Sequence, residues 1–197
     1  MKKGPEYFQA FFAVKPAAIQ RTVLVSPIIY PNQFEKMLGQ KGQHSRALLG
    51  YLLANFKGLT FIKTAMSQAA VADLVLLLKG TKCRQVIFLG AIGALASGFK
   101  IGDTYATDKA QEIYSFASLH DETVVKLKAL KKQGVIGIDI ESQAFFSAAK
   151  KVGLKAQAYY VITDLPLCKP FYKPQTPKER QKIREAVALL CQKQLSI

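Results

Sequence analysis

Residues 86–110 read VIFLGAIGALASGFKIGDTYATDKA, and this stretch decides the fold class. The apolar residues 86–89 predict a short buried strand that ends on Gly90, and Gly93 follows three residues later. A glycine turn after a strand lets a ligand approach the backbone and leaves amide groups free to bind it. A plain tight turn explains the same pattern, so the two interpretations stay open on these residues alone.

Strand-like and helix-like segments alternate on both sides of this stretch. The patterns predict strands over residues 22–30, 59–63, 104–107, 135–140 and 158–162. Helices are expected over residues 43–56, 67–78, 121–132 and 141–151, and from the capping box of Thr176, Pro177 and Glu179 onward. This alternation indicates an α/β protein, a three-layer α/β/α sandwich with a central mixed sheet. No repeat or linker divides the chain, so residues 1–197 are expected to form a single domain.

Composition narrows the class of protein. Of the 197 residues, 50% are hydrophobic and 21% are charged, which excludes a disordered chain, and no run is long enough for a membrane span. The net charge of +15 raises the question of a nucleic-acid, membrane-surface or small anionic partner. The basic run 126–132 is more typical of a solvated helix face, and the aromatic residues do not interleave with arginines, so a nucleic-acid partner is not expected. Three isolated cysteines favour a reducing cytoplasm and predict no metal site.

Two carboxylates stand at the ends of predicted strands. Glu141 follows the strand-like residues 135–140, and Asp164 follows residues 158–162. Ligands of α/β proteins collect outside the carboxyl ends of the strands, and a buried acid is costly unless it is paired or used. The alternative is that each carboxylate caps a helix or occupies its first turn.

Three segments together resemble a known family. Residues 86–110, residues 137–164 (GIDIESQAFFSAAKKVGLKAQAYYVITD) and, more weakly, residues 61–78 (FIKTAMSQAAVADLVLLL) are similar to the nucleoside phosphorylase/nucleosidase superfamily. The similar branch contains 5′-methylthioadenosine/S-adenosylhomocysteine nucleosidase and the futalosine-type nucleosidases. The resemblance covers roughly residues 59–165 and implies the fold of that superfamily and cleavage of a nucleoside.

The resemblance also implies roles for individual residues. Glu141 matches the glutamate that holds the ribose hydroxyls, and Asp164 matches the aspartate that protonates the purine N7. Thr163 stands where a serine usually orients that aspartate, and Ile140 stands where a methionine often packs beneath the ribose. The expected contacts beside the sugar come from the glycine turn, residues Gly90, Ala91 and Gly93.

Departures from the family pattern bear on the reaction. Phosphorylases of this superfamily hold phosphate with an arginine and a serine, and Phe88 and Ala91 occupy those positions here. Hydrolysis by water is therefore favoured over phosphorolysis. Asn32 falls near the glutamate that activates the water in the hydrolases, and Glu35 lies one turn further on. Either is a candidate, and a plain surface role for Glu35 is an equal alternative.

The middle of the chain is shortened. Only 36 positions separate Asp103 from Asp139, several dozen fewer than is usual in the family, where this part holds a flap and part of the purine pocket. Tyr114 or Phe116 could supply stacking from this segment, although core packing is the more common role.

The leading interpretation is a cytoplasmic, homodimeric nucleosidase. It acts on 6-amino-6-deoxyfutalosine, methylthioadenosine or S-adenosylhomocysteine, with no metal or organic cofactor and no membrane association. The basic charge slightly favours the first of these, which carries a benzoate. Two alternatives stay open, a phosphate-dependent nucleoside phosphorylase and a degenerate nucleoside- or nucleic-acid-binding protein of the same fold.

Overall fold

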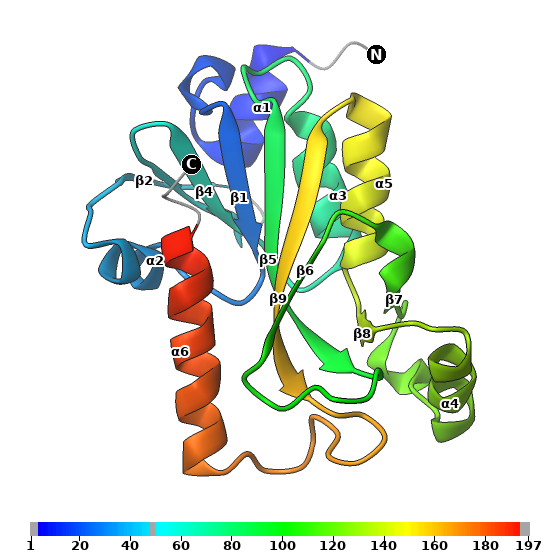
Figure 1. Ribbon diagram of the computed structural model, residues 1–197. Coiled ribbons are helices and arrows are strands. Elements are labelled where there is room, and N and C mark those ends of the chain that lie inside the picture. The colour runs from blue at the N-terminus through cyan, green and yellow to red at the C-terminus, as the bar shows by residue number, and fades with distance from the viewer. Residues whose placement is uncertain (1–3, 48–49, 194–197) are drawn as a thin grey trace.

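A computed structural model describes residues 4–47 and 50–193 of the chain (Figure 1). One central sheet holds its strands in the order β2-β3-β4-β1-β5-β8-β7, and β9 pairs with both β5 and β6. The strands are β1 (Thr22–Ser26), β2 (Gln43–Arg46), β3 (Leu52–Asn55), β4 (Leu59–Lys63), β5 (Gln85–Ala94), β6 (Thr104–Thr107), β7 (Ile113–Ser115), β8 (Gly137–Asp139) and β9 (Lys155–Asp164). Strands β4, β1, β5 and β9 run parallel to one another. The pairs β2–β3, β3–β4 and β6–β9 and the short pair β5–β8 are antiparallel.

Helices cover both faces of the sheet. α3 (Gln68–Leu77) and α5 (Ser142–Val152) lie on one face, and α2 (Pro31–Leu38) and α6 (Pro177–Lys193) lie on the other (Figure 1). α1 (Pro5–Phe12) sits at the amino ends of the parallel strands, and α4 (Val124–Lys132) lies beside β8 beyond the carboxyl end of β5. The predicted α/β fold with helices on both faces of a mixed sheet is therefore confirmed.

Each face of the sheet has its own apolar layer. On the α3/α5 face, Phe88 of β5 packs with Phe145 of α5 at 5.2 Å between ring centroids. On the other face, Phe34 of α2 stacks on Phe61 of β4 at 4.5 Å. Burial of such aromatic side chains dominates the energetics of a core.

The helix predicted over residues 43–56 was wrong. Residues Gln43–Arg46 and Leu52–Asn55 form an antiparallel pair instead, and β3 continues into the sheet through β4. Leu53 and Ala54 point to opposite apolar layers, which is the alternation of a strand buried on both faces. Sheet pairing satisfies the backbone groups of this run, so tertiary context overrides its helix-like spacing. Leu48 and Leu49, which contributed to that spacing, lie outside the described residues.

The strand predicted over residues 86–89 is longer than expected. β5 continues through the glycines to Ala94, because β9 pairs with it up to Gly93 and supplies partners for the backbone. Gly90 and Gly93 are therefore strand residues, and the expected glycine turn was wrong. The pairing shifts register between Ile92 and Gly93, which re-aims the end of the strand.

The helix starts were predicted closely. Ser67 caps α3 by accepting from the Ala70 N–H, and Thr176 and Glu179 exchange hydrogen bonds at the start of α6. α4 begins at Val124, three residues later than expected, where Thr123 is the cap. α1, α2 and the short β2 and β7 were not anticipated by the sequence patterns.

Candidate active site

A pocket of about 180 Å³ opens at the carboxyl ends of β5, β8 and β9. In Figure 1 this end of the sheet lies at the bottom, where the loop after β9 and the segment before α4 converge. Four carboxylates line the pocket: Glu122, Asp139, Glu141 and Asp164. The remaining lining is mostly apolar and includes the exposed side chains of Met66, Leu119 and Phe171.

Glu141 lies between β8 and the first residue of α5, and its side chain is buried. It occupies the N-cap position of α5, but its carboxylate makes no capping hydrogen bond. Burial, and in second place the negative charge of Asp139, raise the pKa of Glu141 to about 8. The Ile140 backbone N–H has the opposite, smaller effect and lowers this pKa. Glu141 therefore stands at the start of α5 without a capping hydrogen bond, and it lines the pocket.

Asp139 performs the capping role that Glu141 does not. Its carboxylate accepts from the Ser142 and Glu141 backbone N–H groups, from Ser142 Oγ, and from Ser115 Oγ at 2.5 Å. The single hydroxyl proton of Ser142 is donated to Asp139, so Ser142 Oγ accepts the hydrogen bond from the Tyr160 hydroxyl, at 2.5 Å. Burial raises the pKa of Asp139 despite these donors. The network joins β7, β8, α5 and β9 and holds the backbone that presents Glu141.

Asp164 is the last residue of β9 and lies in the same pocket as Glu141. Thr163 Oγ1 donates to its carboxylate at 3.2 Å, and the Phe171 backbone N–H also stabilises the charged form. Burial outweighs both and raises the pKa of Asp164 to about 6. A loop rather than a helix follows Asp164, so the carboxylate caps no helix.

The structure brings together six of the nine residues proposed from sequence. Asp164, Glu141, Ala91, Gly93, Ile140 and Thr163 all line the pocket. Gly90 does not, because it is a buried strand residue that pairs with Tyr160, and the Phe88 ring occupies the space above it.

Asn32 and Glu35 lie on α2, away from this pocket. Asn32 lines a separate hollow beside β2. Glu35 accepts hydrogen bonds from the Gly42 N–H and from His44 Nε2, each at 2.6 Å. These contacts lower the pKa of Glu35, with the Gly42 N–H as the largest cause.

Seven residues of the pocket lining were not among the candidates from sequence: Met66, Ile92, Leu119, Glu122, Ile138, Asp139 and Phe171. Among those from irregular segments are Glu122 and Phe171. Glu122 precedes α4 in the shortened middle segment, and among the described residues no side chain or backbone group hydrogen-bonds to its carboxylate. Burial, and then the charge of Asp164, raise the pKa of Glu122. Phe171 comes from the proline-rich loop 165–174. Neither segment has a periodic pattern, so no local signal aims them at the pocket. Tyr114 and Phe116 do not line the pocket, since they pack together and against Lys126.

The pocket lining contains carboxylates but no lysine, arginine or histidine. Across residues 4–47 and 50–193, no group of three or more His, Cys, Asp or Glu side chains could hold a metal ion. In the same ranges, no helix has both the length and the apolar character to cross a membrane.

Comparisons with known proteins agree with this architecture. No protein-family model matches the sequence, and the search of curated protein sequences gives no match. Among solved structures, uridine phosphorylase from Vibrio fischeri matches with a TM-score of 0.73 and 15% identity over 93% of each chain. Purine nucleoside phosphorylase from Toxoplasma gondii, solved with immucillin-H, has a TM-score of 0.75 and 13% identity, covering 93% of this chain and 94% of its own.

AMP nucleosidase from Bacteroides thetaiotaomicron matches with a TM-score of 0.70 and 15% identity over 96% of each chain. These three structures are two phosphorylases and one nucleosidase, so the likeness in fold spans proteins of both names. The chain has the fold of the nucleoside phosphorylase/nucleosidase superfamily, as its strand-end segments predicted.

Proposed function

We propose that this protein hydrolyses the N-ribosidic bond of a 5′-modified adenosine and releases adenine. The observation that carries the proposal is the convergence of Glu141 and Asp164 on one pocket at the carboxyl ends of the strands. Neither carboxylate makes a hydrogen bond that caps a helix, and burial raises the pKa of both. Two acids of this kind in one apolar pocket suit a reaction that separates charge between a sugar and a base.

In this proposal Asp164 protonates the leaving base. Cleavage of the C1′–N9 bond leaves the bonding electron pair on the purine, and a proton delivered to N7 neutralises it. A pKa of about 6 places Asp164 close to the operating pH, where a general acid is most effective. Thr163 Oγ1 and the Phe171 N–H fix the orientation of the carboxyl group.

Glu141 acts on the ribose. Its carboxylate accepts hydrogen bonds from the ribose hydroxyls, and its negative charge becomes most favourable as positive charge develops on the sugar. Because burial disfavours the charged form of Glu141 in the free protein, a cationic sugar in the pocket stabilises that form. Its interaction is therefore stronger with the transition state than with the substrate.

The pocket lining favours water over phosphate as the nucleophile. Its four carboxyl groups are accompanied by no basic side chain, so the lining offers no positive charge to bind an inorganic anion. Phe88, at one position where the phosphorylases hold phosphate, is fully buried in the core. The lack of a basic side chain, together with the apolar Met66, Leu119 and Phe171, favours an uncharged 5′ group such as methylthio over a benzoate.

Glu122 is the best-placed group to hold the attacking water, in place of Asn32 or Glu35. It is the pocket carboxylate that no other described side chain or backbone group hydrogen-bonds. Its raised pKa makes it a better proton acceptor than an ordinary glutamate.

Chromatographic measurement of adenine release tests the proposal. The substrates are methylthioadenosine, S-adenosylhomocysteine and 6-amino-6-deoxyfutalosine, each with and without phosphate. Asp164→Asn is compared with Asp121→Asn, an exposed aspartate outside the pocket lining. We expect phosphate-independent release that Asp164→Asn abolishes and Asp121→Asn leaves intact. Release that requires phosphate would make the protein a phosphorylase, and no release from any substrate would overturn the proposal.

A further inference from the structure

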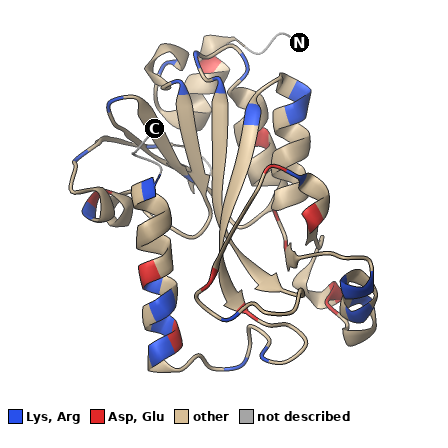
Figure 2. Cartoon of the chain, viewed as in Figure 1, with Lys and Arg blue, Asp and Glu red and all other residues tan. Residues whose placement is uncertain are grey.

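The end of the sheet opposite the pocket carries a row of cations. Four neighbouring parallel strands, in the order β4-β1-β5-β9, each begin beside one basic residue. These residues, called the basic row below, are Lys57, Arg21, Arg84 and Lys155. The backbone joins three of them directly, because the Arg84 N–H donates to Arg21 O at 2.8 Å and the Lys155 N–H donates to Arg84 O at 3.1 Å. Figure 2 shows blue segments at these strand ends.

The cations of the basic row are exposed and are not neutralised. All four residues are exposed, and none takes part in an ion pair between described residues. Arg84 Nη1 donates to Cys83 O at 2.9 Å, which leaves its other N–H groups available. The turns that lead into the four strands, residues 56–58, 20–21, 79–84 and 153–154, contain no acidic residue.

Further basic side chains flank the basic row, and they outnumber the acidic side chains beside them. Lys15 and Lys82 share a shallow hollow with Glu6. Lys79 and Lys151 share another hollow with Asp73. Four cations against two acids leave the surroundings positive as well, so the field of the row extends beyond its four side chains.

The length and the positive charge of this surface suit a nucleic-acid backbone. Neighbouring strands lie about 4.8 Å apart, so the row is roughly 14 Å long, which spans about four steps of a duplex at 3.4 Å per step. The exposed large apolar side chains of the described residues all lie elsewhere, which disfavours insertion into a membrane and stacking of unpaired bases. We propose that the basic row binds the phosphate backbone of duplex nucleic acid without sequence preference.

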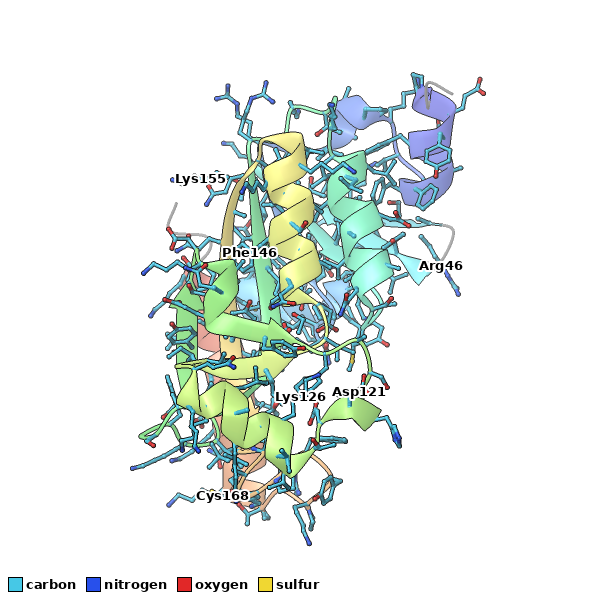
Figure 3. All side chains as sticks on the ribbon, turned by 90° about the vertical axis from the view of Figure 1, so that its right-hand side faces the viewer. Arg46, Asp121, Lys126, Phe146, Lys155 and Cys168 are labelled. Carbon is cyan, nitrogen blue, oxygen red and sulfur yellow. The ribbon has the colours of Figure 1, made fainter. Side chains whose placement is uncertain are left out.

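This site is independent of the pocket. The row lies at the amino ends of β4, β1, β5 and β9, and the pocket lies at the carboxyl ends of β5, β8 and β9. Figure 3 shows Lys155 in the upper half of the molecule, and Asp121 and Lys126, which flank the pocket segment, in the lower half. The expectation that nucleic acid is not a partner followed from the run 126–132, and the inference here rests on a surface formed by residues far apart in sequence.

Fluorescence anisotropy with a labelled 20-base-pair duplex tests the proposal. The protein is titrated at 50, 100 and 200 mM salt as wild type and as two triple variants of equal charge. Arg21→Glu/Arg84→Glu/Lys155→Glu alters the row, and Lys128→Glu/Lys131→Glu/Lys132→Glu alters the exposed face of α4. A set with glutamine in place of glutamate repeats the comparison if a charge-reversed protein is unfolded by circular dichroism.

We expect wild-type affinity to fall about 40-fold from 50 to 200 mM salt, which corresponds to about three phosphate contacts. The row variant should bind at least tenfold more weakly at 50 mM salt, and the α4 variant should change less than threefold. Equal losses in the two variants would mean that net charge alone drives binding, and would overturn the proposal. Absence of binding at 50 mM salt, or row-dependent binding to phosphatidylserine vesicles without duplex binding, would also overturn it.

Discussion

Gly93 of β5 lies directly against Asp164 of β9, where the pairing of the two strands shifts register. A Cβ on residue 93 would lie 3.0 Å from Asp164 Oδ2 and 2.6 Å from Pro166 Cγ. The absence of a side chain at position 93 therefore allows the carboxylate and the loop after it to close over the end of β5. The same approach brings Asp164 into the pocket that Glu141 lines.

Gly93→Ala should strongly lower the rate of adenine release while the protein still folds. The added methyl group pushes against Pro166 and Asp164 and displaces the carboxylate, and displacements of about 1 Å cost on the order of 100-fold in rate. Adenine release and thermal melting are measured together, with Gly4→Ala as the control because its Cβ would meet nothing within 4 Å. Wild-type turnover in Gly93→Ala would contradict the placement of Asp164 in the reaction.

Glu141→Gln should change how stability depends on pH. The pKa of Glu141 rises from 4.5 to about 8 on folding, so between these values the folded protein holds a proton that the unfolded chain has released. The contribution of Glu141 to the free energy of unfolding is therefore fully present at low pH, and it falls by about 1.4 kcal/mol per pH unit as the pH rises through that window. Denaturant unfolding from pH 5 to pH 8 should show a smaller loss of stability in Glu141→Gln than in wild type. Parallel curves would show that Glu141 is ionised normally in the folded protein.

Ser142→Ala should be more destabilising than Tyr160→Phe. Removal of the Ser142 hydroxyl deprives buried Asp139 of one donor and leaves the Tyr160 hydroxyl without its acceptor, at a cost of about 1–3 kcal/mol. Tyr160→Phe removes the outer hydroxyl and keeps the hydrogen bond from Ser142 to Asp139. Urea unfolding of both variants measures the difference, and the reverse order of stability would contradict the network described here.

Glu122→Gln should lower kcat by at least tenfold and leave KM within a few-fold of wild type. The amide cannot take a proton from water, whereas it keeps the size of the carboxyl group. Asp121→Asn is the matched control, since it removes a neighbouring carboxylate that does not line the pocket. Unchanged turnover in Glu122→Gln would assign the water to another group.

The sequence predicted the parts of the site that lie at strand ends. Thr163 and Asp164 end β9, which runs parallel to β5, so the sheet brings them to the carboxyl end of β5. Ile140 and Glu141 follow β8, which pairs antiparallel with the end of β5, so the rule for parallel sheets does not account for their place in the pocket. Glu122 and Phe171 come from irregular segments, whose path depends on packing and leaves no periodic signal. The predicted helix over 43–56 failed for a related reason, because the free edge of β4 decides how that segment pairs.

Hydrolysis in water enriched in oxygen-18, with phosphate present, tests the central claim most directly. The protein is incubated with methylthioadenosine under these conditions, and the sugar product is analysed by mass spectrometry. We predict free 5-methylthioribose carrying one oxygen-18 atom at C1, with adenine released in equal amount, and no product from Asp164→Asn. Formation of a sugar 1-phosphate without the heavy isotope at C1, or release of adenine by Asp164→Asn at the wild-type rate, would contradict the account.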